Sequence, residues 1–171
     1  MGTVAENIRI VRERINNAAL KVGRDPSAVK LMGVTKTVDD ERIIEAINSG
    51  IDIVGENYVQ EAKRKIEKMG RAVPWHLIGH LQTNKAKYAV KLFDMVHSVD
   101  SVSLARELDR RAGMAGTRLD ILIEVNVSGE ESKSGVGPEG AMDLASQIAR
   151  FPCLSIKGLM TMAPWFDDPE K

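Results

Sequence analysis

The sequence predicts an α/β fold built on a parallel sheet, with a (β/α) barrel favoured over an open doubly wound sheet. Short apolar segments alternate with longer segments in which apolar residues recur at helical spacing. The strand-like segments begin at fairly even intervals, which favours repeated strand–helix units with parallel pairing. Polar residues follow each strand-like segment, as they do at the active face of a barrel.

The first helix is predicted from Val4 to Val22, because apolar residues recur at helical spacing between Thr3, a suitable N-cap, and Gly23, a suitable stop. Strands and helices then alternate. Strands are expected at 29–35, 51–55, 75–78, 95–99, 119–127 and 154–161, and helices between them at 39–48, 58–69, 83–92, 102–112 and 138–150. These six strands fall short of the eight in a closed barrel. Either the sheet is open or two units are absent from this chain.

Composition limits the classes of function. The 171 residues, expected to form one domain over 1–171, carry 24 basic and 24 acidic side chains. This balance gives no reason to expect a nucleic acid or an anionic membrane as a partner. Cys153 is the only cysteine, which excludes an internal disulfide and fits a reducing compartment. We therefore expect a cytoplasmic protein without a membrane span.

Lys36 is the strongest single candidate for chemistry. It ends the first apolar strand, at the end where α/β barrels place their active sites. If it is desolvated there, a lysine loses its proton near neutral pH and attacks an aldehyde to form a Schiff base. A surface lysine at a strand end is the competing interpretation.

Three other patterns are assigned to structure. The glycines at 135, 137 and 140 match a dinucleotide-binding spacing, but a polar stretch separates them from the preceding strand. His76 and His80 straddle a strand end with no glutamate between them, so no zinc site is expected. Cys153 enters a strand and is expected to pack in the core.

Six stretches of the chain match one family in the family's own order. They are Gly33–Thr37, Gly55–Glu61, Trp75–Lys85, Ser98–Ser101, Asn126–Ser128 with Ser132–Gly135, and Gly158–Met162. Together they resemble the pyridoxal 5′-phosphate (PLP) homeostasis family, also called the YggS or proline synthase co-transcribed family. The resemblance implies a TIM-type (β/α)8 barrel of the alanine racemase N-terminal-domain type, with about six of its eight strands in this chain.

The resemblance also implies a function. PLP would be the ligand, held by Lys36 as a Schiff base, in a non-catalytic role in vitamin B6 and amino-acid homeostasis, with PLP-dependent apo-enzymes as candidate partners. Neither a catalytic residue nor a metal site is expected. Many relatives carry a second lysine where this chain has Val38, so transfer of PLP between two lysines is not implied here. The residues expected around the cofactor ring, each at or just after a predicted strand's carboxyl end, are Asn57, His80, Asn84, Ser98 and Met162.

Two alternatives stay open. One is a PLP-dependent amino-acid racemase or decarboxylase of the same fold, and the other is an interaction fragment that binds no PLP. Relatives continue for about two more strand–helix units, which supply the phosphate site in this architecture. The domain is therefore expected to be truncated at its C-terminus. It would be monomeric when complete, and as this fragment it would associate or recruit a complementing segment.

Overall fold

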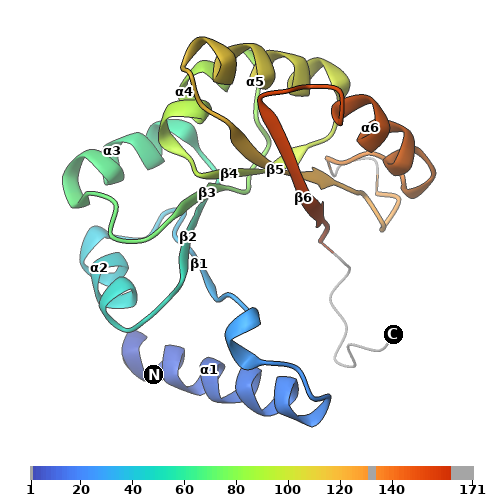
Figure 1. Ribbon diagram of the computed structural model, residues 1–171. Helices are drawn as coiled ribbons and strands as arrows, with labels where there is room; N and C mark the ends of the chain where they lie inside the picture. Colours follow the sequence, from blue (N-terminus) through green and yellow to red (C-terminus); the bar gives the residue numbers. More distant parts are fainter. Residues whose placement is uncertain (1, 131–133, 163–171) are drawn as a thin grey trace. The chain divides into compact units, whose positions relative to one another are not determined.

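Strands and helices alternate along the chain in a computed structural model, which describes residues 2–130 and 134–162 (Figure 1). The strands are β1 (Met32–Val34), β2 (Ile53–Glu56), β3 (Trp75–Leu77), β4 (Met95–Val99), β5 (Leu119–Glu124) and β6 (Leu154–Met160). The helices are α1 (Val4–Lys21), α2 (Asp40–Asn48), α3 (Val59–Met69), α4 (Ala86–Leu92), α5 (Val102–Met114) and α6 (Ala141–Ile148). Three 3₁₀ turns are η1 (Pro26–Ala28), η2 (Thr83–Lys85) and η3 (Pro138–Gly140). The predicted order of elements is confirmed.

The strands are hydrogen-bonded in sequence order from β1 to β6. The pairs β1–β2, β4–β5 and β5–β6 are parallel, as the strand–helix alternation predicts. The β5–β6 register shifts by one residue, so that Ile121 faces Ile156 but Leu122 faces Gly158. Lys157 is the extra residue of this bulge.

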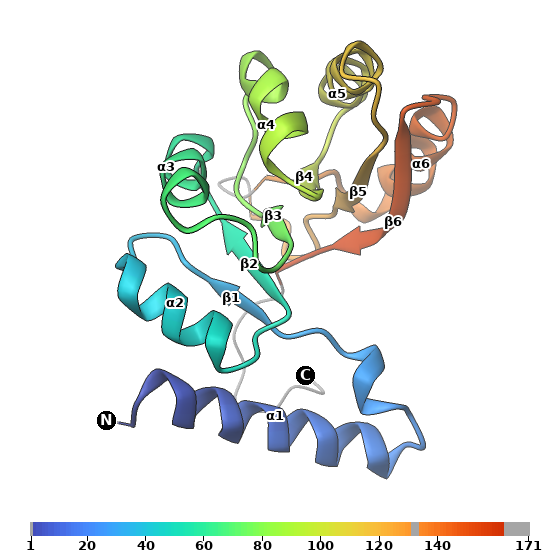
Figure 2. The same cartoon turned by 60° about the vertical axis from the view of Figure 1, so that its left-hand side comes forward.

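By its packing the chain divides into two compact units, Met1–His76 and Leu77–Lys171. In the first unit, Ile43 of α2, Val54 of β2 and Ala62 of α3 are fully buried. Helix α1 begins at Val4 as predicted, with the side chain of Thr3 as its cap, whereas α2 begins at Asp40, one residue later than predicted, because Asp39 is its cap. Helix α1 lies beside α2 (Figure 2).

In the second unit, the alternating residues Leu119, Ile121 and Ile123 of β5 are buried. Leu108 of α5 and Ile148 of α6 are buried as well. Along the described ranges, no helix combines the length and the apolar character that crossing a bilayer requires.

Several predicted boundaries are wrong. Strand β1 begins at Met32 rather than Val29, because the chain is already extended at Val29 but its pairing with β2 starts only at Met32, opposite Ile53. Strand β5 ends at Glu124 rather than Val127, and beyond it Val125 forms an isolated bridge to Val136 while its N–H donates to the carbonyl of Met160 at 2.8 Å. The helices predicted to begin at Thr83 and Pro138 open with 3₁₀ turns. Ser132 and Lys133, part of one family stretch, lie outside the described residues.

Candidate functional site

Lys36 occupies a tight turn at the carboxyl end of β1. Thr35 continues the ladder, since its N–H donates to the carbonyl of Gly55 at 3.0 Å. The turn is closed by the N–H of Val38, which donates to the carbonyl of Thr35 at 3.0 Å. Thr35 is buried and Lys36 is exposed, so the lysine side chain projects away from the anchored backbone. The predicted position of Lys36 at a strand end is confirmed.

The backbone of this turn is strained. Thr37 has a φ of 60°, the only positive value at a non-glycine residue in the described part of the chain. A β-branched side chain fits this region poorly, and such a residue costs on the order of 1–3 kcal/mol. Strain of this size persists only where surrounding contacts hold it. The turn must therefore be held by its neighbours.

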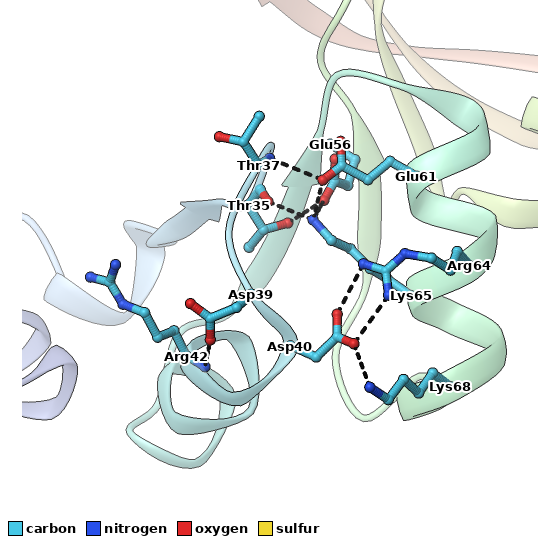
Figure 3. Close-up of polar contacts among 10 residues, drawn as sticks. All are labelled: Thr35, Thr37, Asp39, Asp40, Arg42, Glu56, Glu61, Arg64, Lys65 and Lys68. Carbon is cyan, nitrogen blue, oxygen red and sulfur yellow. Dashed lines mark hydrogen bonds and ion pairs between the residues drawn. The ribbon is translucent and has the colours of Figure 1, made fainter.

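Those neighbours form a buried ionic cluster under the turn, made of Thr35, Glu56, Glu61 and Lys65 (Figure 3). The ammonium of Lys65, whose side chain is 0% exposed, donates to three acceptors. These are the carbonyl of Thr35 at 2.5 Å, Oε1 of Glu56 at 2.6 Å and Oε1 of Glu61 at 2.7 Å. An ammonium has three N–H groups, so each one has a partner.

The carboxylates of the cluster reach the turn on both sides of Lys36. On one side, the hydroxyl of Thr35 donates to Oε1 of Glu56 at 2.5 Å. On the other, the N–H of Thr37 donates to Oε1 of Glu61 at 2.9 Å. The hydrogen bond from Lys65 lowers the pKa of Glu61, and the bond from Thr37 lowers it further against the opposing effect of burial. Glu61 is thus held as an anion beneath the turn.

The amine of Lys36 makes no hydrogen bond or ion pair with the described residues. The side chain is exposed, so the desolvation expected from its place at the strand end is not provided by these residues. Asn57 follows β2 directly, and its Oδ1 is buried without a hydrogen-bond partner in the part of the chain that the structure describes. Such an acceptor is costly to leave unpaired and is available to a ligand's donor.

The other four predicted site residues belong to the second unit. Ser98 is fully buried in β4, and its hydroxyl donates to the carbonyl of Gly79 at 2.7 Å. Asn84 is exposed within η2, so it belongs to the start of the helical segment. Met162 lines a cavity of about 170 Å³ together with Glu124, Val125, Asn126 and Ser134. His80 is exposed, with its Nδ1 3.5 Å from the hydroxyl of Ser134.

The same unit contains three titratable side chains at or just after the carboxyl ends of β3, β4 and β5. Nδ1 of His80 lies 4.0 Å from a carboxylate oxygen of Asp100. Glu124 ends β5, and its Oε2 is buried without a hydrogen-bond partner among residues 2–130 and 134–162. Burial raises the pKa of Glu124, and the negative charge of Asp100 raises it further while His80 opposes the shift. No three His, Cys, Asp or Glu side chains gather as metal ligands in the described ranges.

Sequence reasoning missed Lys65 and Glu124. A signal for Lys65 was present, because Lys65 falls within the apolar face of α3, three residues after the buried Ala62, and four after Glu61. A lysine on such a face needs a buried partner. Glu124 is the last residue of β5, a strand in which buried residues alternate with more exposed ones. Its place in this alternation is one of the more exposed positions, where a carboxylate is ordinary, so there was no sequence signal that one of its oxygens is buried.

The family model of the alanine racemase N-terminal domain matches residues 2–171. A pyridoxal phosphate homeostasis protein of Aquifex aeolicus is 42% identical over 166 residues, which cover 96% of this chain and 73% of the relative. This chain belongs to the PLP homeostasis family. The predicted resemblance to this family is confirmed.

Solved structures agree with membership of the PLP homeostasis family. A protein from Bifidobacterium adolescentis, described as unknown, superposes with a TM-score of 0.90 at 36% identity, covering 96% of this chain and 71% of that one. PipY of Synechococcus elongatus, solved with PLP bound, superposes with a TM-score of 0.77 at 35% identity, covering 95% and 71%. The predicted fold class, a parallel α/β fold of the alanine racemase N-terminal type with six strands in this chain, is confirmed.

Proposed function

We propose that this chain binds PLP through the amine of Lys36 and acts in vitamin B6 and amino-acid homeostasis in the cytoplasm. The observation that carries the proposal is the turn at the end of β1, where an exposed lysine without a partner among residues 2–130 and 134–162 stands between two anchored residues. PLP supplies an aldehyde, which condenses with a primary amine. A relative with 35% identity, PipY, was solved with PLP bound.

The residues of the first unit suit such a ligand. Lys36 presents a primary amine that makes no hydrogen bond or ion pair with any described residue. Asn57 presents a buried amide oxygen that accepts no hydrogen bond from any residue that the structure describes. We also propose that His80, Asn84, Ser98 and Met162 contribute to PLP binding, as predicted from their places at strand ends. Substitution of each, with PLP affinity as the readout, tests this assignment.

The test of the proposal is covalent trapping. The protein is incubated with PLP, reduced with borohydride, digested and analysed by mass spectrometry. We expect the pyridoxyl-phosphate label on the peptide that contains Lys36, and its loss in Lys36→Ala. The matched control is Lys30→Ala, which removes a nearby lysine that precedes β1 and should leave labelling intact. Label mainly at Lys85 or Lys133 would contradict the assignment.

We propose that the activity is binding rather than turnover, in keeping with relatives that are named homeostasis proteins. PLP-dependent apo-enzymes are the proposed recipients of the bound PLP. Fold-type III enzymes need a placed proton donor or acceptor near the substrate. We expect no PLP-dependent racemisation of alanine above that of free PLP.

One observation favours a second candidate, an amino-acid racemase or decarboxylase. Glu124 is a partly buried carboxylic acid whose pKa is raised by burial, and general acid–base catalysts are often carboxyl groups of this kind. The discriminating assay measures racemisation and decarboxylation by the PLP-loaded protein and by Glu124→Gln. Turnover that depends on both Lys36 and Glu124 would replace the binding proposal by the enzymatic one.

A further inference from the structure

The buried ionic cluster has its contacts on the backbone that flanks Lys36. It bonds the carbonyl and hydroxyl of Thr35 on one side and the N–H of Thr37 on the other. Lys36 itself takes no part. We infer that Glu61 and Lys65 are positioning residues for PLP: they hold the Thr35–Val38 turn in the conformation that presents the Lys36 amine. This inference rests on the proposed function, because it concerns the same lysine.

The strained residue shows why the turn needs this support. Thr37 lies at a φ of 60°, where its β-branched side chain is disfavoured. Its N–H is held by Glu61 at 2.9 Å, and Glu61 is held in turn by Lys65 at 2.7 Å. Without Glu61 the turn can relax to a negative φ at Thr37. The direction of the preceding lysine would then change, because both residues belong to one four-residue turn.

The chemistry of the cluster is suited to holding one geometry. The side chains of Lys65 and Glu56 are both 0% exposed, whereas that of Glu61 is 22% exposed. A buried ammonium must keep its partners, so Lys65 fixes Glu61 in place with little freedom to rearrange. Glu61 lies at the edge of the cluster and can be changed with less damage to the core. It is therefore the residue on which the inference is tested.

The same helix provides a matched control. Arg64 of α3 forms a two-pronged ion pair with Asp40, at 3.1 and 3.0 Å, and Lys68 contacts the same carboxylate at 2.8 Å (Figure 3). This second cluster also joins α3 to the segment after β1, but it contacts the first residue of α2 and not the Lys36 turn. Arg64→Met should thus disturb the attachment of α3 without releasing the turn.

The experiment compares PLP affinity, followed by absorbance of the bound cofactor, with melting temperature in one set of variants. If Glu61→Ala leaves about one tenth of the molecules with the turn in the conformation that presents the Lys36 amine, the Kd for PLP rises about tenfold. Glu61→Gln keeps an oxygen that accepts from Thr37, so we expect its Kd within about twofold of the parent. Arg64→Met should also stay within about twofold, since surface ion pairs contribute little.

A rescue variant separates positioning from general destabilisation. Glycine adopts positive φ without steric cost, so Thr37→Gly removes the need for support at this residue. In the Thr37→Gly background, we expect Glu61→Ala to weaken PLP binding by less than about threefold, against tenfold in the parent. Loss of packing around α3 would not be rescued in this way. If Glu61→Ala does not fold, Glu61→Met, which keeps the side-chain volume, takes its place.

The outcomes are distinguishable. Failure of the parent protein to be trapped at Lys36 overturns the proposed function and this inference with it. Trapping at Lys36 with equal affinities in Glu61→Ala and the parent overturns the inference alone. Equal weakening by Glu61→Ala and Arg64→Met, or the same effect of Glu61→Ala in both Thr37 backgrounds, also overturns it. A selective loss in Glu61→Ala that Glu61→Gln and Thr37→Gly restore supports it.

Discussion

Replacing Lys65 by methionine removes the only cation of the buried cluster while keeping a side chain of similar length. All three N–H groups of Lys65 are bonded, at 2.5, 2.6 and 2.7 Å. The side chains of Lys65 and Glu56 are both 0% exposed, so Lys65→Met leaves Glu56 as a buried carboxylate without its counter-ion. Breaking a fully buried pair in this way costs about 3–5 kcal/mol. That is a large fraction of the roughly 5–15 kcal/mol that stabilises a typical domain.

Urea unfolding followed by circular dichroism measures this loss. Adding Glu56→Gln to Lys65→Met removes the stranded charge, so the double variant should be more stable than the sum of the single changes predicts, by roughly 0.5–3 kcal/mol. Lys63→Met is the control on the same helix, because Lys63 and Glu67 form an exposed pair at 3.7 Å. It should change the unfolding midpoint little. A loss below about 1 kcal/mol in Lys65→Met would refute the buried-cluster reasoning.

Two further predictions concern acid sensitivity and one glycine. The folded pKa of Glu61 is lowered, so the unfolded state binds more protons as pH falls. Its contribution to stability should be complete above the unfolded pKa of about 4.3 and be lost as pH falls through the lower folded value. Urea midpoints from pH 7 to pH 3 should therefore fall less steeply in Glu61→Gln; identical slopes would contradict this. Gly135 has a φ of 116°, and a Cβ there would lie 2.7 Å from the backbone nitrogen of Asn126. Gly135→Ala should therefore cost about 1–3 kcal/mol by thermal unfolding, and an unchanged melting temperature would count against this backbone conformation.

Much of the fold follows from local sequence. Helices α1 and α2 begin where Thr3 and Asp39 supply cap oxygens, and both interactions are local hydrogen bonds over a few residues. Strand β4 was predicted with its observed limits, because its apolar and polar residues are bounded by clear turn residues. Strand ends were less accurate. The end of β5 depends on partners that its own residues do not specify, since Val125 bridges Val136 and donates to the carbonyl of Met160.

The order of strands and helices, the family, and the place of Lys36 at a strand end could all be predicted from the sequence. These depend on periodicity, on caps and on ordered motifs, which are properties of neighbouring residues. Which partners Lys65 has in the interior, and that Lys36 stays exposed, follow from the tertiary structure, because both depend on residues far apart in sequence. The contact from Lys65 to Thr35 spans 30 residues and that from Thr37 to Glu61 spans 24. The place of Lys65 on the apolar face of α3 is a local signal of burial, but its partners Thr35 and Glu56 are set by how α3 packs on the turn after β1, which local sequence does not encode.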